Sequence, residues 1–165
     1  MSDKQKNFIS AVVYVYNAAN NIDFFLKTLI NVLDSNFDKF EIICVNDASS
    51  DGSKEIIKKF GRTSDNCMLS ILNMSYHQGL EMAMHAGADL AIGDFVFEFD
   101  RLAQDYDPSL IMQVYCRSLE GYDIVSCGKG HARASSGLFY SVFNRHSGMQ
   151  YMLKSETFQI GRAHV

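Results

Sequence analysis

Residues 41–60, EIICVNDASSDGSKEIIKKF, contain the pattern that decides the fold. The apolar stretch over residues 41–45 predicts a strand buried on both faces, as in a parallel sheet. This strand stops at residues 46–52, where Asn, Asp, Ser and Gly are typical of a turn. A helix is predicted over residues 53–60, so the segment has the strand–turn–helix order of a βαβ unit.

The same alternation continues on both sides of this segment. Residues 8–16 predict a buried strand, and Asn20 or Asn21 can cap the helix that follows it. The later elements are predicted as strands over 68–73, 94–99 and 123–127, and as helices over 78–92, 108–119 and 138–145. This order predicts a three-layer α/β/α fold around a mostly parallel sheet, because parallel strands need crossovers of a dozen or more residues.

Composition places the chain among globular proteins. It has 165 residues, of which 47% are hydrophobic and 21% charged, with a single proline. No run of about 18 apolar residues predicts a transmembrane helix, and the polar start MSDKQKNF predicts a cytoplasmic protein. The cysteines show no CxxC spacing, so we expect buried free thiols at all four positions: Cys44, Cys67, Cys116 and Cys127.

Charge is distributed unevenly along the chain. Residues 1–100 carry 8 basic and 14 acidic side chains, which makes nucleic acid an improbable partner. Residues 124–165 carry five basic side chains and one acidic one. This basic segment suits a phosphate or an anionic lipid surface, and a solvated face is the simpler alternative. We expect residues 129–165 to lie over the sheet as an extension.

Polar residues follow three of the predicted strands at the point where each strand ends. Tyr16 and Asn17 follow the first strand, Asn46 and Asp47 the second, and Asp100 the fourth. Ligands of such sheets bind at the carboxyl ends of the strands, so these residues are the candidates for a site. The carboxylate of Asp47 either accepts hydrogen bonds from a nucleobase or ribose, or caps the turn that follows it.

Other polar residues have weaker interpretations. Glu98 and Asp100 alternate along one strand, so they either hold a divalent cation together or include one structural carboxylate. His77 and His85 have no third ligand at a zinc-site spacing. Gly87 falls within a predicted helix, where close approach to the sheet or to a ligand would explain the cost of a glycine. No GxSxG, Walker loop, HExxH or GxGxxG occurs in the chain.

Two segments near the start of the chain resemble the inverting family 2 glycosyltransferases, which share the GT-A fold. Residues 11–17, AVVYVYN, are similar to the first strand of that family and its "VxxYN" end. Residues 41–53 are similar to the family pattern "EIIVVDDGSTDGT", with Asn46 in place of the first Asp.

Two further segments complete this resemblance over residues 8–100. Residues 77–87 are similar to "NxGxxxAxNxG", with His77 and His85 at the two Asn positions. Residues 93–100 are similar to the strand that ends at the family's "DxD" motif.

The tail resembles a narrower branch of the family. Its matching residues are Arg133, Leu138-Phe139-Tyr140, Asn144, residues 155–158 and Arg162, similar to "LFYxxxN…TxxFxLxSR" of the polyprenyl-phosphate glycosyltransferases. That branch includes dolichol-phosphate mannose synthases. The resemblance implies residues 1–128 as a nucleotide-sugar-binding GT-A core, and residues 129–165 as a basic acceptor-side extension of a longer protein.

The resemblance implies a nucleoside-diphosphate sugar as donor and an inverting transfer to an acceptor. The donor-binding residues that it implies are Tyr14, Tyr16, Asp47, Gly79 and Asp100. Asp100 matches the first Asp of the motif that positions the ribose and the metal-bound diphosphate, so it is the implied catalytic residue and ligand of Mg²⁺ or Mn²⁺. The motif reads Asp100-Arg101-Leu102, however, and lacks the usual second Asp.

The acceptor implied by the branch is a lipid phosphate, with a saccharide as the alternative. A phosphate needs no general base to deprotonate it, and Arg133, the second implied catalytic residue, would bind it together with Arg145. We therefore expect peripheral association with the inner face of the membrane. Two other interpretations are a non-catalytic nucleotide-sugar-binding module and a receiver-like domain, although Asn17-Ala18-Ala19 lacks the acidic pair of a receiver.

Overall fold

The computed structural model describes residues 4–61, 66–102, 106–129 and 155–162. Strands and helices alternate from β1 to β5, and a further strand, β6, follows. Their bounds are β1 Ile9–Val15, α1 Ile22–Asn36, β2 Phe40–Asn46, α2 Ser53–Lys58, β3 Cys67–Asn73, α3 Leu80–Leu90, β4 Phe95–Phe99, α4 Ser109–Ser118, β5 Ile124–Lys129 and β6 Ser155–Arg162. The predicted alternation is thus confirmed from β1 to β5, with boundaries that differ by a few residues.

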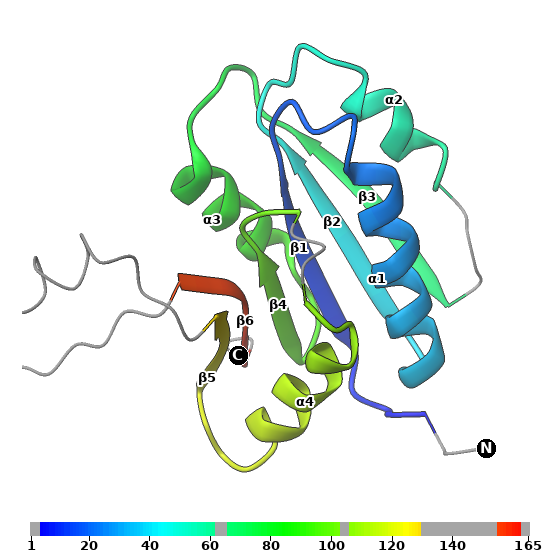
Figure 1. Ribbon diagram of the computed structural model, residues 1–165, viewed down its shortest axis with the longest axis vertical. Helices are drawn as coiled ribbons and strands as arrows, with labels where there is room; N and C mark the ends of the chain where they lie inside the picture. Colours follow the sequence, from blue (N-terminus) through cyan, green and yellow to red (C-terminus); the bar gives the residue numbers. More distant parts are fainter. Residues whose placement is uncertain (1–3, 62–65, 103–105, 130–154, 163–165) are drawn as a thin grey trace, which may run out of the picture.

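The strands form one sheet in the order β3-β2-β1-β4-β6-β5 (Figure 1). Strands β1, β2, β3 and β4 pair in parallel, whereas β6 runs antiparallel to both β4 and β5. The mostly parallel sheet of the predicted fold is therefore confirmed. Because β1 lies at the centre, between β2 and β4, the loops that follow these three strands meet at one edge of the sheet.

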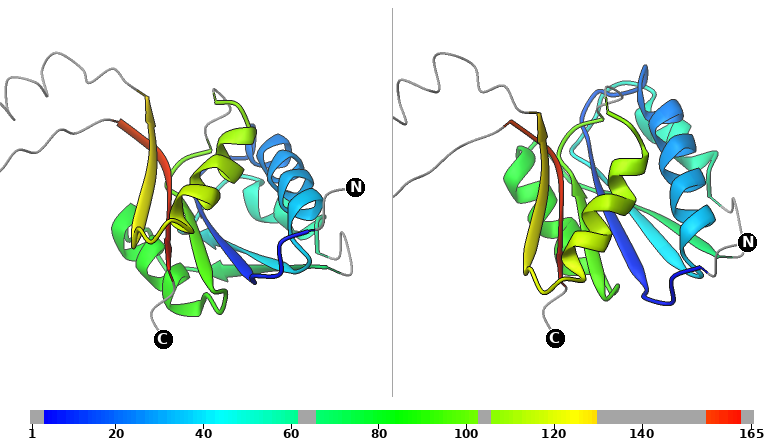
Figure 2. Two further views of the ribbon diagram at one scale, coloured as in Figure 1. Left: turned by 90° about the horizontal axis from the view of Figure 1, so that it is seen from below. Right: turned by 60° about the horizontal axis from the view of Figure 1, so that its bottom comes forward.

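Helices cover both faces of the sheet, which gives the predicted three layers (Figure 2). Alternate residues of β1, including Val13, pack with α1, α2 and α4 in the larger core. Val12 points the other way and packs with Ala83 and Met84 of α3. This separation follows from the two-residue period of side chains along a strand.

Two glycines allow other elements to approach the central strand. A Cβ added to Gly87 of α3 would lie 2.4 Å from Cγ1 of Val12, so the predicted close approach of this helix to the sheet is confirmed. A Cβ added to Gly93, just before β4, would lie 2.6 Å from the backbone nitrogen of Ser10 in β1.

A buried polar cluster lies beside Gly93 at the amino ends of these strands. The hydroxyl of Ser10 donates to Oε1 of Glu41, which also accepts the backbone N–H of Ile92 at 2.9 Å. The backbone N–H of Gly93 donates to the hydroxyl of Ser10 at 2.8 Å. Both Ser10 and Glu41 are buried, and their polar atoms are paired with each other and with the loop before β4.

The structure corrects two expectations from the sequence. Residues 155–162 do not lie over the sheet: they form β6 within it, between β4 and β5. The cysteines are free, but only Cys44 is buried, while Cys67 and Cys127 are half-buried and Cys116 is exposed.

The predicted helix over 138–145 lies outside the described residues, and the division at residue 128 stays a prediction. Among the described helices, none has the length and apolar character needed to cross a bilayer.

Candidate nucleotide-sugar site

Three of the predicted site residues follow parallel, adjacent strands. Tyr16 comes directly after β1, Asp47 after β2 and Asp100 after β4. Val15 pairs with Asn46 in the register of β1 and β2, which places Tyr16 and Asp47 at the same level of the sheet. Parallel pairing thus brings residues from distant parts of the sequence to one edge, as the alternation predicts.

Asp47 is fully buried and bonds the loop before α3 rather than the turn after β2. Its two carboxylate oxygens accept the backbone N–H groups of Gln78 at 2.8 Å and Gly79 at 2.9 Å. The turn after β2 is capped instead by Asn46, whose Oδ1 accepts the backbone N–H of Ser49 at 3.2 Å. Asp47 therefore ties the end of β2 to the start of α3.

The same carboxylate has two side-chain partners. The hydroxyl of Tyr14 donates to Oδ2 of Asp47 at 3.1 Å, and Nδ1 of His77 lies 2.8 Å from the same oxygen. Burial raises the pKa of Asp47, but the bonds from Gln78, Gly79, Tyr14 and His77 outweigh it and hold the pKa below its usual value. Asp47 is thus ionised at neutral pH.

Tyr14 remains a hydrogen-bond donor at neutral pH. Burial and its bond to Asp47 raise the pKa of its hydroxyl to about 12. A neutral phenol can donate to the carboxylate, whereas a phenolate next to it would be repelled. The hydroxyl of Tyr14 thereby helps to fix Asp47 in place from β1.

Gly79 shapes the loop that Asp47 binds. Its φ of 91° lies in the left-handed region, which glycine adopts without the steric penalty that a Cβ would bring. This conformation turns the chain into α3 while the backbone N–H groups of Gln78 and Gly79 both face the Asp47 carboxylate. The sequence-predicted Gly79 is therefore part of the same cluster.

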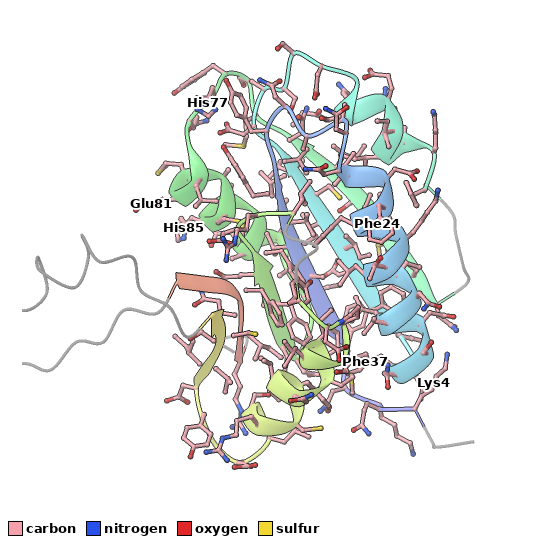
Figure 3. The ribbon with its side chains drawn as sticks, in the orientation of Figure 1. Lys4, Phe24, Phe37, His77, Glu81 and His85 are labelled. Atoms are coloured by element: carbon pink, nitrogen blue, oxygen red, sulfur yellow. The ribbon has the colours of Figure 1, made fainter. Side chains whose placement is uncertain are left out.

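An aromatic stack lies over this cluster at the surface. The rings of Tyr16 and His77 are stacked, with 4.0 Å between centroids and 24° between planes. Tyr16 is 41% exposed. Figure 3 shows His77 beyond the start of α3, at the end of the sheet where β1 and β2 finish. Tyr14, Tyr16, Asp47 and Gly79 are thus brought together, with His77 among them.

Asp100 borders a pocket of about 360 Å³ on the α3 side of the sheet. Its Oδ1 atom is buried. The pocket is lined by Leu80, Glu81, Met84, His85, Ala88, Glu98, Asp100, Phe158 and Gln159. Figure 3 shows Glu81 and His85 on α3 at this side of the molecule. Helix α3 therefore links the cluster around Asp47 to the pocket beside Asp100, since its first residues follow the loop that Asp47 binds and also line the pocket.

Glu98 of β4 and Gln159 of β6 lie opposite each other on two neighbouring strands that border this pocket. They are paired in the antiparallel register of β4 and β6, and Nε2 of Gln159 donates to Oε2 of Glu98 at 2.8 Å. Glu98 and Asp100 line the same pocket, in keeping with the alternation of side chains along a strand. Glu98 is thus engaged in a bond between strands.

The metal hypothesis finds limited support in the part of the chain that the structure describes. There, no three His, Cys, Asp or Glu side chains gather in a way that could hold a metal ion. The described residues therefore do not form a complete Mg²⁺ or Mn²⁺ site by themselves, and the role of Asp100 as a ligand stays a prediction. Arg133 and Arg145, the predicted acceptor residues, lie outside the described residues.

Sequence reasoning missed two participants. His77 is absent from the predicted donor-binding residues, although its match to the first Asn of the pattern over residues 77–87 and its place two residues before Gly79 were signals that it belongs to the loop at the sheet edge. Gln159 was missed because its strand, β6, was not predicted. The alternation of the buried Phe158 and Ile160 around it was the available signal.

Comparison with known proteins identifies the family. The profile described as Glycosyl transferase family 2 matches residues 10–155. An uncharacterized glycosyltransferase of Synechocystis is 33% identical over 145 residues, which cover 83% of this chain and 44% of the relative. The undecaprenyl-phosphate 4-deoxy-4-formamido-L-arabinose transferase of Edwardsiella ictaluri is 35% identical over 127 residues, which cover 76% of this chain and 38% of that enzyme. The chain thus spans less than half the length of these relatives.

Solved structures agree on the fold. A mannosyltransferase from Pyrobaculum calidifontis, in complex with GDP-mannose and Mn²⁺, has a TM-score of 0.69 with 20% identity, over 96% of this chain and 45% of that one. A mannosyl-3-phosphoglycerate synthase from Rubrobacter xylanophilus has a TM-score of 0.68 with 19% identity, over 95% of this chain and 54% of that one. The GT-A fold is thereby confirmed. The 35% identity to an undecaprenyl-phosphate transferase confirms the resemblance to the polyprenyl-phosphate branch, and the family profile shows that the chain belongs to glycosyl transferase family 2.

Proposed function

We propose that this chain is the donor-binding part of a glycosyltransferase that uses a nucleoside-diphosphate sugar. The observation that carries the proposal is the exposed ring of Tyr16 beside the ionised Asp47, at the carboxyl edge of a parallel sheet. Aromatic rings stack on nucleobases, and a carboxylate accepts hydrogen bonds from base or ribose groups. Tyr14 and Gly79 would hold Asp47 in position for that contact.

The pocket beside Asp100 would hold the sugar of the donor. Its apolar lining from Leu80, Met84 and Phe158 suits the carbon face of a sugar ring, and its carboxylates suit the hydroxyl groups. Asp100 lies where it would position the ribose and the diphosphate between base and sugar. A solved structure of the same fold was crystallised with GDP-mannose, which supports a nucleoside-diphosphate sugar as the kind of donor.

We further propose a polyprenyl phosphate as the acceptor. Undecaprenyl-phosphate transferases among the relatives support this choice. A phosphate oxygen would attack the anomeric carbon of the donor sugar, the bond from that carbon to the diphosphate would break, and the configuration would invert. Because the nucleophile is already an anion, no general base is required. Arg133 and Arg145 would neutralise the acceptor, with the enzyme in the cytoplasm at the inner face of the membrane.

A non-catalytic nucleotide-sugar-binding module is the second candidate. The sequence Asp100-Arg101-Leu102, which lacks the family's second Asp, favours it. The two candidates differ in turnover: both bind the donor, but only an enzyme releases the nucleoside diphosphate when donor and undecaprenyl phosphate are supplied together. Measuring that release with and without Mn²⁺ separates them and tests the metal prediction.

Replacing Tyr16 by alanine is expected to weaken nucleotide binding about tenfold or more, because stacking of one base on an aromatic ring contributes roughly 1–3 kcal/mol. Isothermal titration calorimetry with UDP and GDP, on the wild-type chain and on the variant, measures this change in affinity. Tyr122→Ala is the matched control, since Tyr122 is similarly exposed but contacts Arg117 away from the edge. Equal affinities of wild type and Tyr16→Ala would contradict the proposed base site.

The charge of the pocket predicts which sugars it accepts. Glu81, Glu98 and Asp100 would repel an acidic sugar, so UDP-glucose is expected to bind about tenfold tighter than UDP-glucuronate. GDP-mannose and GDP-mannuronate form the corresponding pair for a guanosine site. Glu98→Gln should reduce this preference severalfold, whereas Glu55→Gln, which removes a charge from an exposed position of α2 on the other face of the sheet, should leave it within twofold. Equal binding of both sugars would overturn the assignment of the pocket.

A further inference from the structure

His77 occupies the place that the proposed function assigns to the nucleobase. Its imidazole is stacked on the Tyr16 ring, with 4.0 Å between the ring centroids and 24° between the ring planes. A base cannot stack on this face of Tyr16 while His77 remains there.

His77 also contacts Asp47, the residue that would accept a hydrogen bond from the base. Its Nδ1 lies 2.8 Å from Oδ2 of Asp47, and the Asp47 side chain is fully buried. The remaining partners of Asp47 are the backbone N–H groups of Gln78 and Gly79 and the hydroxyl of Tyr14. Removal of the imidazole would therefore expose the carboxylate while three bonds keep it in place.

The backbone on both sides of His77 is anchored. The backbone N–H of Met74 donates to the carbonyl of Asn46 at 2.9 Å, and those of Gln78 and Gly79 donate to Asp47. The side chain of His77, by contrast, is half exposed and has open solvent beside it. A side-chain rotation of His77 can thus uncover Tyr16 and Asp47 without rearrangement of the loop.

We infer that the His77 side chain keeps the base site closed in the absence of donor and rotates outward when a nucleobase binds. This inference rests on the proposed function. The incoming base replaces both contacts of the imidazole, since it stacks on Tyr16 and donates a hydrogen bond to Asp47. Donor affinity is consequently reduced by the fraction of time that the site is closed.

Replacing His77 by alanine is expected to tighten the binding of UDP or GDP about fivefold, which corresponds to a site open roughly one-fifth of the time in the wild-type chain. The gain should appear in the association rate, because the variant needs no rotation before the base enters. His77→Asn keeps a side chain that can reach Asp47 but removes the stacked ring, so it should retain most of the gain. Stopped-flow and calorimetric titrations with both nucleotides measure these changes.

Tyr76→Ala is the matched control, because it removes an exposed ring from the same loop without opening the site. NMR of the full chain labelled at its histidines gives a readout independent of affinity: the His77 imidazole signals should shift on addition of nucleotide. Weaker binding by His77→Ala, or His77 signals that do not move at saturating nucleotide, would overturn the inference. Absence of UDP and GDP binding in every variant would instead refute the proposed function, and this inference with it.

Discussion

Alanine in place of Asp47 is expected to lower the free energy of unfolding by about 3 kcal/mol. The substitution leaves the backbone N–H groups of Gln78 and Gly79 without their acceptor, and each such group costs about 1–3 kcal/mol when it stays dry. Urea unfolding followed by circular dichroism measures the difference. Asp89→Ala, at an exposed position of α3, should change stability by less than about 0.5 kcal/mol.

The pH dependence of stability gives a second check on Asp47. Its pKa in the folded protein lies below the ordinary value for an unfolded chain, so the unfolded state binds a proton more readily. The stabilisation is therefore complete above the unfolded pKa of about 3.9 and is lost as the pH falls through the folded pKa. The difference in the free energy of unfolding between wild type and Asp47→Asn should accordingly become smaller at acidic pH. A difference that became larger there would contradict the lowered pKa of Asp47.

Gly93→Ala is expected to destabilise the protein by about 3 kcal/mol or more. The added Cβ would lie 2.6 Å from the backbone nitrogen of Ser10, 2.7 Å from its hydroxyl oxygen and 2.9 Å from the carbonyl carbon of Ile9. Because β1 is paired on both sides, its backbone cannot move away, and overpacking of this kind commonly costs 1–3 kcal/mol. The bond from Gly93 to Ser10 would be strained as well.

Gly52→Ala is the control for this prediction. A Cβ at Gly52 would meet no atom within 4 Å, and its φ of −75° suits any residue. We expect its stability to stay within about 0.5 kcal/mol of wild type. Thermal unfolding of both variants measures the contrast, and a Gly93→Ala protein as stable as Gly52→Ala would contradict the packing described for β1 and β4.

The parallel part of the fold was predictable because its pattern is local. A continuous apolar strand such as Glu41–Val45, followed by a turn and a helix, has few alternatives to a βαβ unit. Strand β6 was not predictable in the same way, since its place between β4 and β5 depends on pairing with residues about 60 positions earlier. Its sequence contains Gly161 and several polar residues, which weaken a purely local signal.

The site was predictable to the level of residues but not of contacts. The ends of β1, β2 and β4 placed Tyr16, Asp47 and Asp100 at one edge, as topology requires. The sequence left open whether Asp47 faces a ligand or a turn. Its bonds to the loop at Gly79 and its contact with His77 depend on the path of the chain between β3 and α3, and residue types alone do not determine that path.

The place of β6 between β4 and β5 has a consequence for how the protein is made. Until residues 155–162 leave the ribosome, β4 has no neighbour on one side and presents unpaired backbone groups, a form that invites aggregation. Phe158 and Gln159 arrive with β6, so the wall that they contribute to the pocket is absent from a nascent chain that ends before residue 158. Sheet completion and pocket formation therefore coincide, because both require residues 155–162.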